Sequence, residues 1–419
     1  MINASPSVKY GLNIWLTIAL FSLFVANSLA IALIALKVPA FTMLSAEPLF
    51  KPFLAYHVNL AMLFWMPAVA GWVWCYFFDL PKSIIKMSLL SSLFALIVLV
   101  VSLVDVTSKV SLSNYYPILH SPVFMTALVV QVCSVTLLAL FVATKAHHGQ
   151  TKLFLAKSAA FAWLIFVVAI VVNIAVIKSN PDGLNYFEQI LWAPGHLQQI
   201  VNGFILASLW ACFLKNGQLT KTLQAVGYMT LFTTIAALIF SFIDINSQLS
   251  RTIFTWQMSL FSWMPMAAVA GYLLTQKLSK HNNSYLNLSL TVALLGILSG
   301  MLITPGNLTV PGHYHGMTGA YNLAFFALLF TIMPIQKNYQ NMLTKLYGAG
   351  LIMLIVGLTW AGRIGIGRKL IAEQQGILTL NQSVALLMIV CGAALAIIIS
   401  LLIIKSFLPK LNDLFKINE

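Results

Sequence analysis

Charged residues are scarce in this chain. Only 8% of its 419 residues are charged, and only nine are Asp or Glu. Hydrophobic residues make up 60% of the chain, and the mean hydropathy of +0.92 lies outside the range of ordinary soluble domains. The four cysteines form no Cys-x-x-Cys pair and give no indication of disulfides or iron–sulfur clusters. The composition therefore excludes an ordinary soluble protein and indicates a polytopic membrane protein.

The net charge of +14 has no single source, because the Lys and Arg residues are dispersed among short loops. This dispersal argues against a nucleic-acid partner, which would favour a concentrated basic patch.

The distribution of basic residues between loops predicts the membrane topology. With the N-terminus inside, fifteen of the 23 basic residues fall on inner loops and tails and eight on outer loops. The excess predicts that both termini lie inside. No small-residue cleavage site directly follows the first apolar run, which we interpret as an uncleaved helix.

Apolar runs of about 20 residues, the length that crosses a bilayer as a helix, recur along the whole chain. The alternating ten-residue pattern of a membrane β-barrel is missing. We predict an all-α polytopic membrane bundle, with residues 1–419 forming a single transmembrane domain of twelve helices in contact with membrane lipid. The predicted spans are roughly 12–36, 53–78, 86–105, 121–143, 158–177, 189–214, 222–243, 255–275, 287–303, 313–335, 347–361 and 383–405.

Two histidines stand two residues apart in Gly-His-Tyr-His-Gly, residues 312–316, where the tenth apolar run opens. On a helix, side chains at i and i+2 point about 200° apart, so His313 and His315 cannot chelate one metal from one face. They suit two sites on opposite sides of the helix, and two haems flanking that helix would fit. The alternative is a pair of interfacial histidines bonded to water and backbone.

Histidines on two other predicted spans enter the membrane from the same, outer side. His57 lies near the outer end of the second span, and His196 follows an aromatic-rich approach into the sixth. Histidine inside a membrane bundle is costly and is a functional candidate by default. Three histidines at one depth favour a cofactor layer, although a lone membrane histidine is usually a packing residue. His57 opposite one histidine of the pair would make a bis-histidine haem site.

Three cations follow the eleventh span on the outer side, against the charge bias of the other loops: Arg363, Arg368 and Lys369. Haem propionates on that side would supply the negative charge that such a cluster binds. An exposed basic loop is the alternative.

Together these features resemble subunit I of the haem–copper oxidase superfamily, which includes cytochrome c oxidases and nitric oxide reductases. The resemblance covers nearly the whole chain. It rests on twelve spans, histidines on spans 2 and 6, the His-x-His at the start of span 10, and the segment Leu295-Gly-Ile-Leu-Ser-Gly300 on span 9.

The resemblance implies two haems and a role for each histidine. His57 and His315 would ligate a low-spin haem, and His313 would be the proximal ligand of a second, high-spin haem. His196 would match the catalytic ligand of the copper or non-haem iron that faces the second haem. Arg368 and Lys369 would correspond to the residues that bind the propionates. Asp79 falls where many oxidases have the aspartate of a proton-channel entrance, although a solvated loop charge is the favoured interpretation.

The chain departs from the family pattern at the second metal. Residues 239–246, late in span 7, contain no histidine pair, and Gln198 and Ile200 stand where many oxidases have glutamate and tyrosine. Asp244, Asn246 and Gln248 offer oxygen ligands, which suit harder cations than copper. We therefore expect haem without stoichiometric copper, with non-haem iron as an alternative second metal.

Two functions follow. The first is a respiratory oxidoreductase subunit of a bacterial inner membrane that reduces oxygen or nitric oxide. It would receive electrons from an outer donor such as cytochrome c and work with additional respiratory subunits. The second is a haem protein without reduction chemistry, used for electron transfer, gas sensing or oxidase assembly. A transporter has little support, because the sequence shows no clear pair of broken helices.

Overall fold

The structure is a computed structural model of the chain, and it describes residues 6–36, 46–105, 107–177, 186–242, 247–275, 284–368 and 379–416. Two short antiparallel strands, β1 (Val110–Ser111) and β2 (Ile118–Leu119), form a hairpin, and the other regular elements described are helices. The helices are α1 (Pro6–Ala35), α2 (Ala46–Asn59), the π-helix η2 (Leu60–Trp65), α3 (Met66–Phe77), α4 (Lys82–Val101), the 3-10 helix η3 (Ser102–Val104), α5 (Pro122–Ala143), α6 (Thr151–Val176), α7 (Tyr186–Ala211), α8 (Lys221–Ser241), α9 (Gln248–Phe261), α10 (Met264–Thr275), α11 (Ser284–Met301), α12 (Thr309–Ile332), α13 (Lys337–Arg363) and α14 (Leu380–Lys416).

Ten stretches of the described helices are long and apolar enough to cross a membrane. This confirms an all-α integral membrane protein. The ten stretches are Gly11–Ala35, Pro48–Phe77, Lys82–Val104, Pro122–Ala143, Thr151–Val176, Lys221–Phe240, Gln248–Thr275, Ser284–Met301, Lys337–Arg363 and Leu380–Pro409. Helices α7 and α12, which carry three of the candidate histidines, are not among them.

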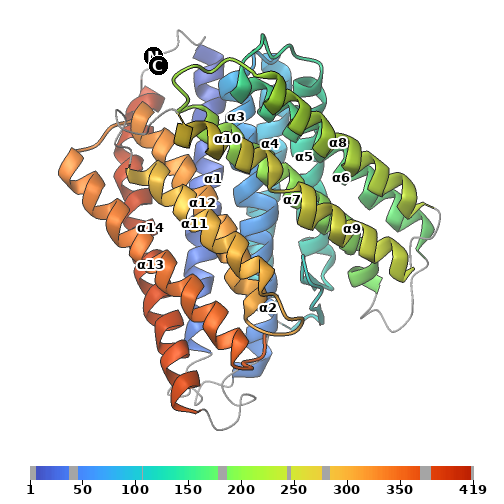
Figure 1. Cartoon of the computed structure of the whole chain (residues 1–419), viewed down its shortest axis with the longest axis vertical. Coiled ribbons are helices and arrows are strands. Elements are labelled where there is room, and N and C mark those ends of the chain that lie inside the picture. The colour runs from blue at the N-terminus through green and yellow to red at the C-terminus, as the bar shows by residue number, and fades with distance from the viewer. Residues whose placement is uncertain are drawn as a thin grey trace. The chain divides into compact units, whose positions relative to one another are not determined.

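The chain divides into two compact units, each described separately below. The first along the chain comprises residues 2–23 and 54–280. Within it α7 packs against α6, α9 and α10, and every residue from Gly203 to Ala211 is buried (Figure 1). Gly203 allows close contact with the turn between α9 and α10, because a Cβ there would lie 2.6 Å from the carbonyl oxygen of Ser262. The helix therefore faces other helices rather than lipid along this half.

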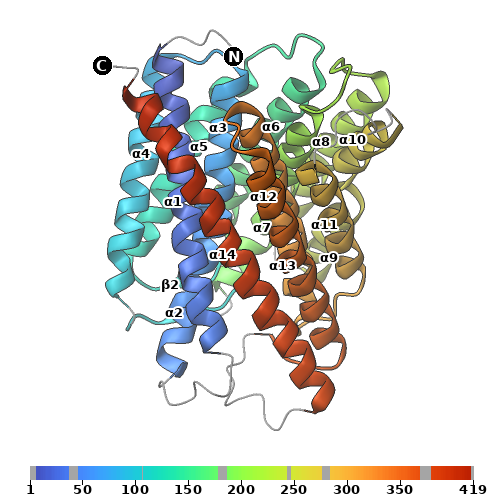
Figure 2. The same cartoon turned by 90° about the vertical axis from the view of Figure 1, so that its left-hand side faces the viewer.

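The other unit comprises residues 24–53 and 281–417. Helix α12 packs against α11 and α13, and α13 packs along α14 (Figures 1 and 2). Small residues set the approach of α11 to α12, since a Cβ on Gly316 would lie 2.4 Å from the Cα of Gly296. Every residue of α12 from Gly319 to Phe330 is buried.

Two predicted spans have different limits in the structure. The eighth span is interrupted at Ser262 and Trp263, between α9 and α10; Pro265 lacks the N–H that would continue the helical ladder. The eleventh span begins ten residues earlier than predicted, because polar residues from Lys337 onward continue the helix beyond its apolar run. Arg363 is consequently the last residue of α13 rather than a loop residue.

Candidate functional site

The two histidines of α12 are each anchored through Nδ1 to a backbone carbonyl. His313 Nδ1 lies 2.8 Å from the carbonyl oxygen of Gly296 on α11, and His315 Nδ1 lies 2.8 Å from that of Pro311. A carbonyl oxygen can only accept, so Nδ1 donates in both cases and carries the proton. In the neutral imidazole the lone pair is then on Nε2. This is the arrangement that orients metal-binding histidines in proteins.

Space for the His313 ring depends on the absence of side chains on α11. A Cβ added to Gly300 would lie 2.7 Å from His313 Nδ1 and 3.1 Å from Cε1. Contacts below 3.0 Å require something to move, and here the ring would have to move. Gly296 and Gly300, one turn apart, thus supply the acceptor and the space for one imidazole.

The basic segment after α13 runs beside the start of α12. The backbone N–H of Arg368 donates to the Gly306 carbonyl at 2.8 Å, and that of Leu308 donates to Ile366 at 3.2 Å. The charge of Arg368 acts on the hydroxyl of Tyr314, which stands between the two histidines. The structure thus brings Arg368 to the His-x-His segment. Arg363 is exposed at the end of α13, and Lys369 lies outside the described residues.

His196 on α7 has the same backbone anchor and, in addition, a tyrosine partner. Its Nδ1 donates to the Trp192 carbonyl at 2.8 Å, and its Nε2 lies 3.1 Å from the Tyr115 hydroxyl and 3.4 Å from Thr255 Oγ1. Since Nδ1 carries the proton, Tyr115 donates to Nε2. Gly195 makes this contact possible, because a Cβ there would lie 2.1 Å from Cγ of Tyr115. Sequence reasoning missed Tyr115, which arrives from the loop before α5.

Gln198, one half-turn after His196, bridges three segments within the same unit. It is 1% exposed, accepts from the Tyr116 hydroxyl through Oε1, and donates through Nε2 to the Met62 carbonyl at 2.5 Å. Met62 lies in the π-helix η2, where the ordinary ladder of backbone hydrogen bonds is shifted. Such segments occur frequently at functional sites. The amide therefore satisfies a carbonyl in an irregular helix.

His57 lies in the last turn of α2, directly before this π-helix, and is half-buried. The loop that carries Tyr115 also contacts this helix, because Asn59 Nδ2 donates to the Pro117 carbonyl at 2.7 Å. His57 and His196 therefore lie near the same loop of one unit. His313 and His315 belong to the other unit, and the pairing of His57 with His315 stays a prediction.

Among the described residues, no group of three or more His, Cys, Asp or Glu side chains converges as a metal site. A haem iron takes at most two such ligands, so this finding does not bear on haem binding. Of the oxygen ligands considered for a second metal, Asp244 and Asn246 lie outside the described residues, and Gln248 begins α9. Asp79 is an exposed residue between α3 and α4.

His120 belongs to the loop that supplies Tyr115 and Tyr116. It follows β2, and its Nε2 lies 2.7 Å from Ser111 Oγ of β1. Partial burial, followed by the positive charge of Lys109, lowers the pKa of His120 below its usual value. The shift favours the neutral imidazole beside Ser111 Oγ of β1.

These observations define an all-α integral membrane protein with imidazoles anchored in both of its units. No family model matches the chain. The chain is 22% identical to the uncharacterized protein RP382 of Rickettsia prowazekii (strain Madrid E), over 92% of this chain and 93% of that protein. It is 24% identical to an uncharacterized protein of Aquifex aeolicus (strain VF5), over 79% and 86% of the two lengths. The similarity to both relatives extends over most of each chain.

Proposed function

We propose that the chain is a haem-binding integral membrane subunit similar to subunit I of the haem–copper oxidases. His57 and His315 would hold one haem and His313 a second. The observation that carries the proposal is the Nδ1 anchor of His313 to Gly296, with Gly300 leaving room for the ring. Such an anchor fixes the tautomer that binds iron through Nε2.

The proposal includes α7 and α12 as two further spans, in addition to the ten apolar stretches. Helix α7 has 26 residues and α12 has 24, so each is about 36–39 Å long and exceeds the hydrocarbon thickness of about 30 Å. Both are less apolar than the other ten because they carry His, Gln, Asn and Gly. Because both helices are largely buried among other helices, they do not need an apolar surface that faces lipid. Bacterial relatives support a bacterial inner membrane as the location.

The residues present fit haem better than they fit copper. Neutral imidazoles with anchored Nδ1 atoms are suitable axial ligands, and Arg368 beside the His-x-His segment is suited to a propionate, with Arg363 and Lys369 nearby in sequence. A bound haem would supply one-electron redox chemistry. His57 and His315 would hold one haem, His313 would hold the other, and Arg368 would neutralise a propionate.

Two activities remain within this proposal. As an oxidoreductase subunit, the protein would pass electrons from an outer donor such as cytochrome c to oxygen or nitric oxide, together with additional respiratory subunits. His196 would then be the single histidine ligand of a copper or non-haem iron. The second candidate is a haem protein for electron transfer, gas sensing or oxidase assembly. The bond from Tyr115 to His196 Nε2 favours this candidate, because it occupies the nitrogen that a metal would need.

The test is the optical spectrum of the purified full-length protein, oxidised and reduced, with and without carbon monoxide. His57→Ala and His315→Ala should each remove the low-spin signal and preserve much of the carbon-monoxide-binding haem. His313→Ala should have the opposite effect. His148→Ala is the matched control, since this histidine lies in the loop after α5. One haem per chain, or spectra that do not respond to the three changes, would refute the assignment.

A further inference from the structure

Two loops of the unit that contains α7 are joined by backbone hydrogen bonds. They are the loop between α5 and α6 and the loop between α7 and α8. The N–H of Thr151 donates to the Gly217 carbonyl at 2.8 Å, and that of Leu219 donates to the Gly149 carbonyl at 2.7 Å. The pairing brings the end of α5 and the starts of α6 and α8 together at one end of the unit.

This end of the unit is strongly basic. Residues 143–158 and 211–228, which contain the two loops and the adjoining helix turns, include no Asp or Glu. They include five lysines: Lys145, Lys152, Lys157, Lys215 and Lys221. Asp105 and Glu188 lie beside the starts of α5 and α7, a full helix length from these loops. Their carboxylates therefore do not neutralise the basic end.

Asp79 is a described carboxylate at the same end, and it lies on the side of Lys152. It follows α3, and the Lys152 Nζ lies 5.4 Å from the centre of the Phe77 ring at the end of that helix. Lys152 and Lys157 are five residues apart, which places their side chains about 140° apart around α6. Lys157 therefore points away from the side of α6 that faces α3.

Lys157 is a half-buried cation within a membrane-spanning stretch. It is the seventh residue of α6, about 9 Å along the helix from its start. Its Nζ donates to the Lys145 carbonyl at 2.6 Å and lies 5.8 Å from the centre of the Phe161 ring. This direction, back toward the loop, is typical of a lysine that extends its charge to the membrane surface. An ammonium group has three donors, and one carbonyl accepts from this one in the described part of the chain.

An exposed apolar stripe of α6 continues from Lys157 into the membrane-spanning part. Phe161 is 40% exposed, Val168 47% and Val171 60%, and their spacing places them on the same side of the helix as Lys157. Large exposed apolar side chains in a stretch that crosses a bilayer face lipid. The stripe therefore offers an acyl chain a surface that begins directly below an ammonium group.

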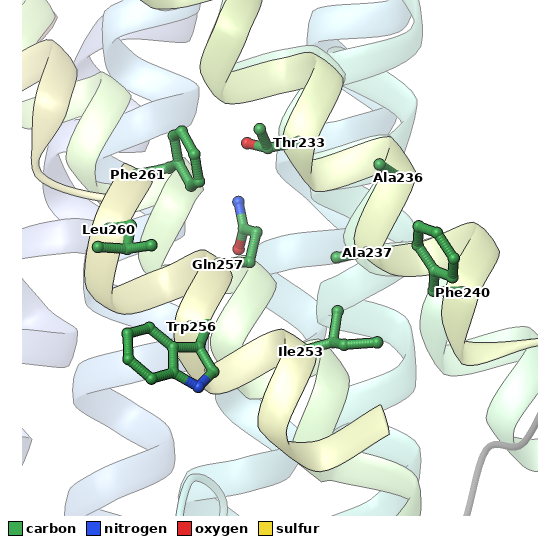
Figure 3. A pocket seen from close by; sticks show the side chains of 9 residues that line it. All are labelled: Thr233, Ala236, Ala237, Phe240, Ile253, Trp256, Gln257, Leu260 and Phe261. Carbon is green, nitrogen blue, oxygen red and sulfur yellow. The ribbon is translucent and has the colours of Figure 1, made fainter. Parts of the chain in front are cut away.

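The groove between α8 and α9 lacks this combination. Figure 3 shows the nine side chains that line it, which are apolar apart from Thr233 and Gln257 and include no cation. An anionic headgroup has no charged partner on that surface. The corner between α5 and α6 provides both the charge and the apolar stripe.

We propose that this corner binds one anionic phospholipid from the surrounding bilayer. The lipid phosphate accepts from the Lys157 ammonium, Lys145 adds a second positive charge, and an acyl chain lies along the stripe from Phe161 to Val171. Basic sites between membrane helices are suited to anionic lipid headgroups. A phosphate ion from water would gain nothing from the stripe, so the geometry commits the site to a lipid. This inference goes beyond the proposed function, because it requires neither haem nor a second metal.

The test is native mass spectrometry of the purified full-length protein titrated with one lipid at a time. The probes are palmitoyl-oleoyl phosphatidylglycerol and phosphatidylcholine, which share the phosphate and both chains. Phosphatidylcholine is neutral overall because its choline cation cancels the phosphate charge. We expect the first phosphatidylglycerol to bind about tenfold more tightly than the first phosphatidylcholine. Equal affinities would overturn the proposal, and so would displacement of phosphatidylglycerol by inorganic phosphate at constant ionic strength.

Charge variants locate the site. Lys157→Gln should remove most of the preference for phosphatidylglycerol, and Lys157→Arg should retain it. Lys405→Gln is the matched control, because it removes the same charge from an exposed position on α14 in the other unit. An equal loss in Lys221→Gln would show that the preference comes from the summed charge of the basic end, and would overturn the corner site.

A second pair of variants keeps the test decisive if Lys157→Gln does not fold. Lys145→Gln should lower the ratio of the two affinities, whereas Phe161→Ala should weaken both lipids and leave their ratio unchanged. Those two results separate the headgroup contact from the acyl-chain contact. An unchanged ratio in Lys145→Gln, or unchanged affinities in Phe161→Ala, would place the lipid elsewhere.

Discussion

The Nδ1 atom of His313 lies 2.8 Å from the carbonyl oxygen of Gly296, which joins α12 to α11 across a contact of small residues. The Cβ of any larger residue at position 316 would meet Gly296 at 2.4 Å. The close helix approach and the histidine anchor therefore depend on each other. The tautomer of His313 is a consequence of how two helices pack.

Gly300→Ala tests this dependence. The added Cβ would lie 2.7 Å from His313 Nδ1, and overpacking of this kind costs about 1–3 kcal/mol. We expect a lower thermal unfolding midpoint and a changed spectrum of the carbon-monoxide-binding haem. Gly271→Ala on α10 is the control, because nothing lies within 4 Å of its added Cβ. Equal behaviour of the two variants would show that the ring is not held as described.

Gln198→Leu should destabilise the protein by roughly 1–3 kcal/mol, because it leaves the Tyr116 hydroxyl and the Met62 carbonyl unpaired. Gln198→Glu should be milder, since a protonated carboxyl can replace one donor and one acceptor. Thermal unfolding in detergent measures both changes. Gln224→Leu, half-buried on α8, should have little effect. Equal losses in Leu and Glu variants would contradict the bridging role of the amide.

The hairpin of β1 and β2 should loosen in acid. The pKa of His120 is lower in the folded protein than in the unfolded chain, mainly because of burial. The unfolded state therefore binds more protons, and stability falls as pH drops below the unfolded value of about 6.5. The protection of residues 109–120 against hydrogen exchange, relative to the intrinsic rate at each pH, should decrease through this range. In His120→Gln this decrease should disappear; if it persists, another group is responsible.

Much of the helical framework could be predicted from the sequence. The apolar runs are long, and in a bilayer every backbone polar group must bond within its own helix. The Pro265 interruption and the early start of α13 were missed because hydropathy does not report helix ends or polar extensions. Lys337–Tyr347 is helical through packing and propensity rather than apolar content.

The candidate histidines could be found from sequence, but their partners could not. Tyr115 and Tyr116 reach α7 from a loop, and no periodicity indicates where a loop side chain will lie. Gln198 was noted only as a substitution, although it bridges Tyr116 and the π-helix. The glycines at 296 and 300 carried a signal, since small residues four apart mark close helix contacts in membranes.

The final prediction is that the purified protein contains haem without stoichiometric copper. A copper site of the oxidase kind needs three neutral imidazoles, and the chain offers His196 alone from α7, while residues 239–246 contain no histidine. Loss of two nitrogen ligands should remove most of the affinity. The remaining nitrogen, His196 Nε2, already accepts from Tyr115 at 3.1 Å, so a metal would have to displace that hydroxyl.

Elemental analysis per haem measures the metal directly. Tyr115→Phe is the informative companion variant, because it removes the competing hydrogen bond and keeps the ring that packs on His196. If the single imidazole is insufficient, copper should stay substoichiometric in both the wild type and Tyr115→Phe. About one copper per chain that disappears in His196→Ala would contradict this prediction and support an oxidase centre. Iron in excess of the haem, lost in the same variant, would instead assign His196 to a non-haem iron.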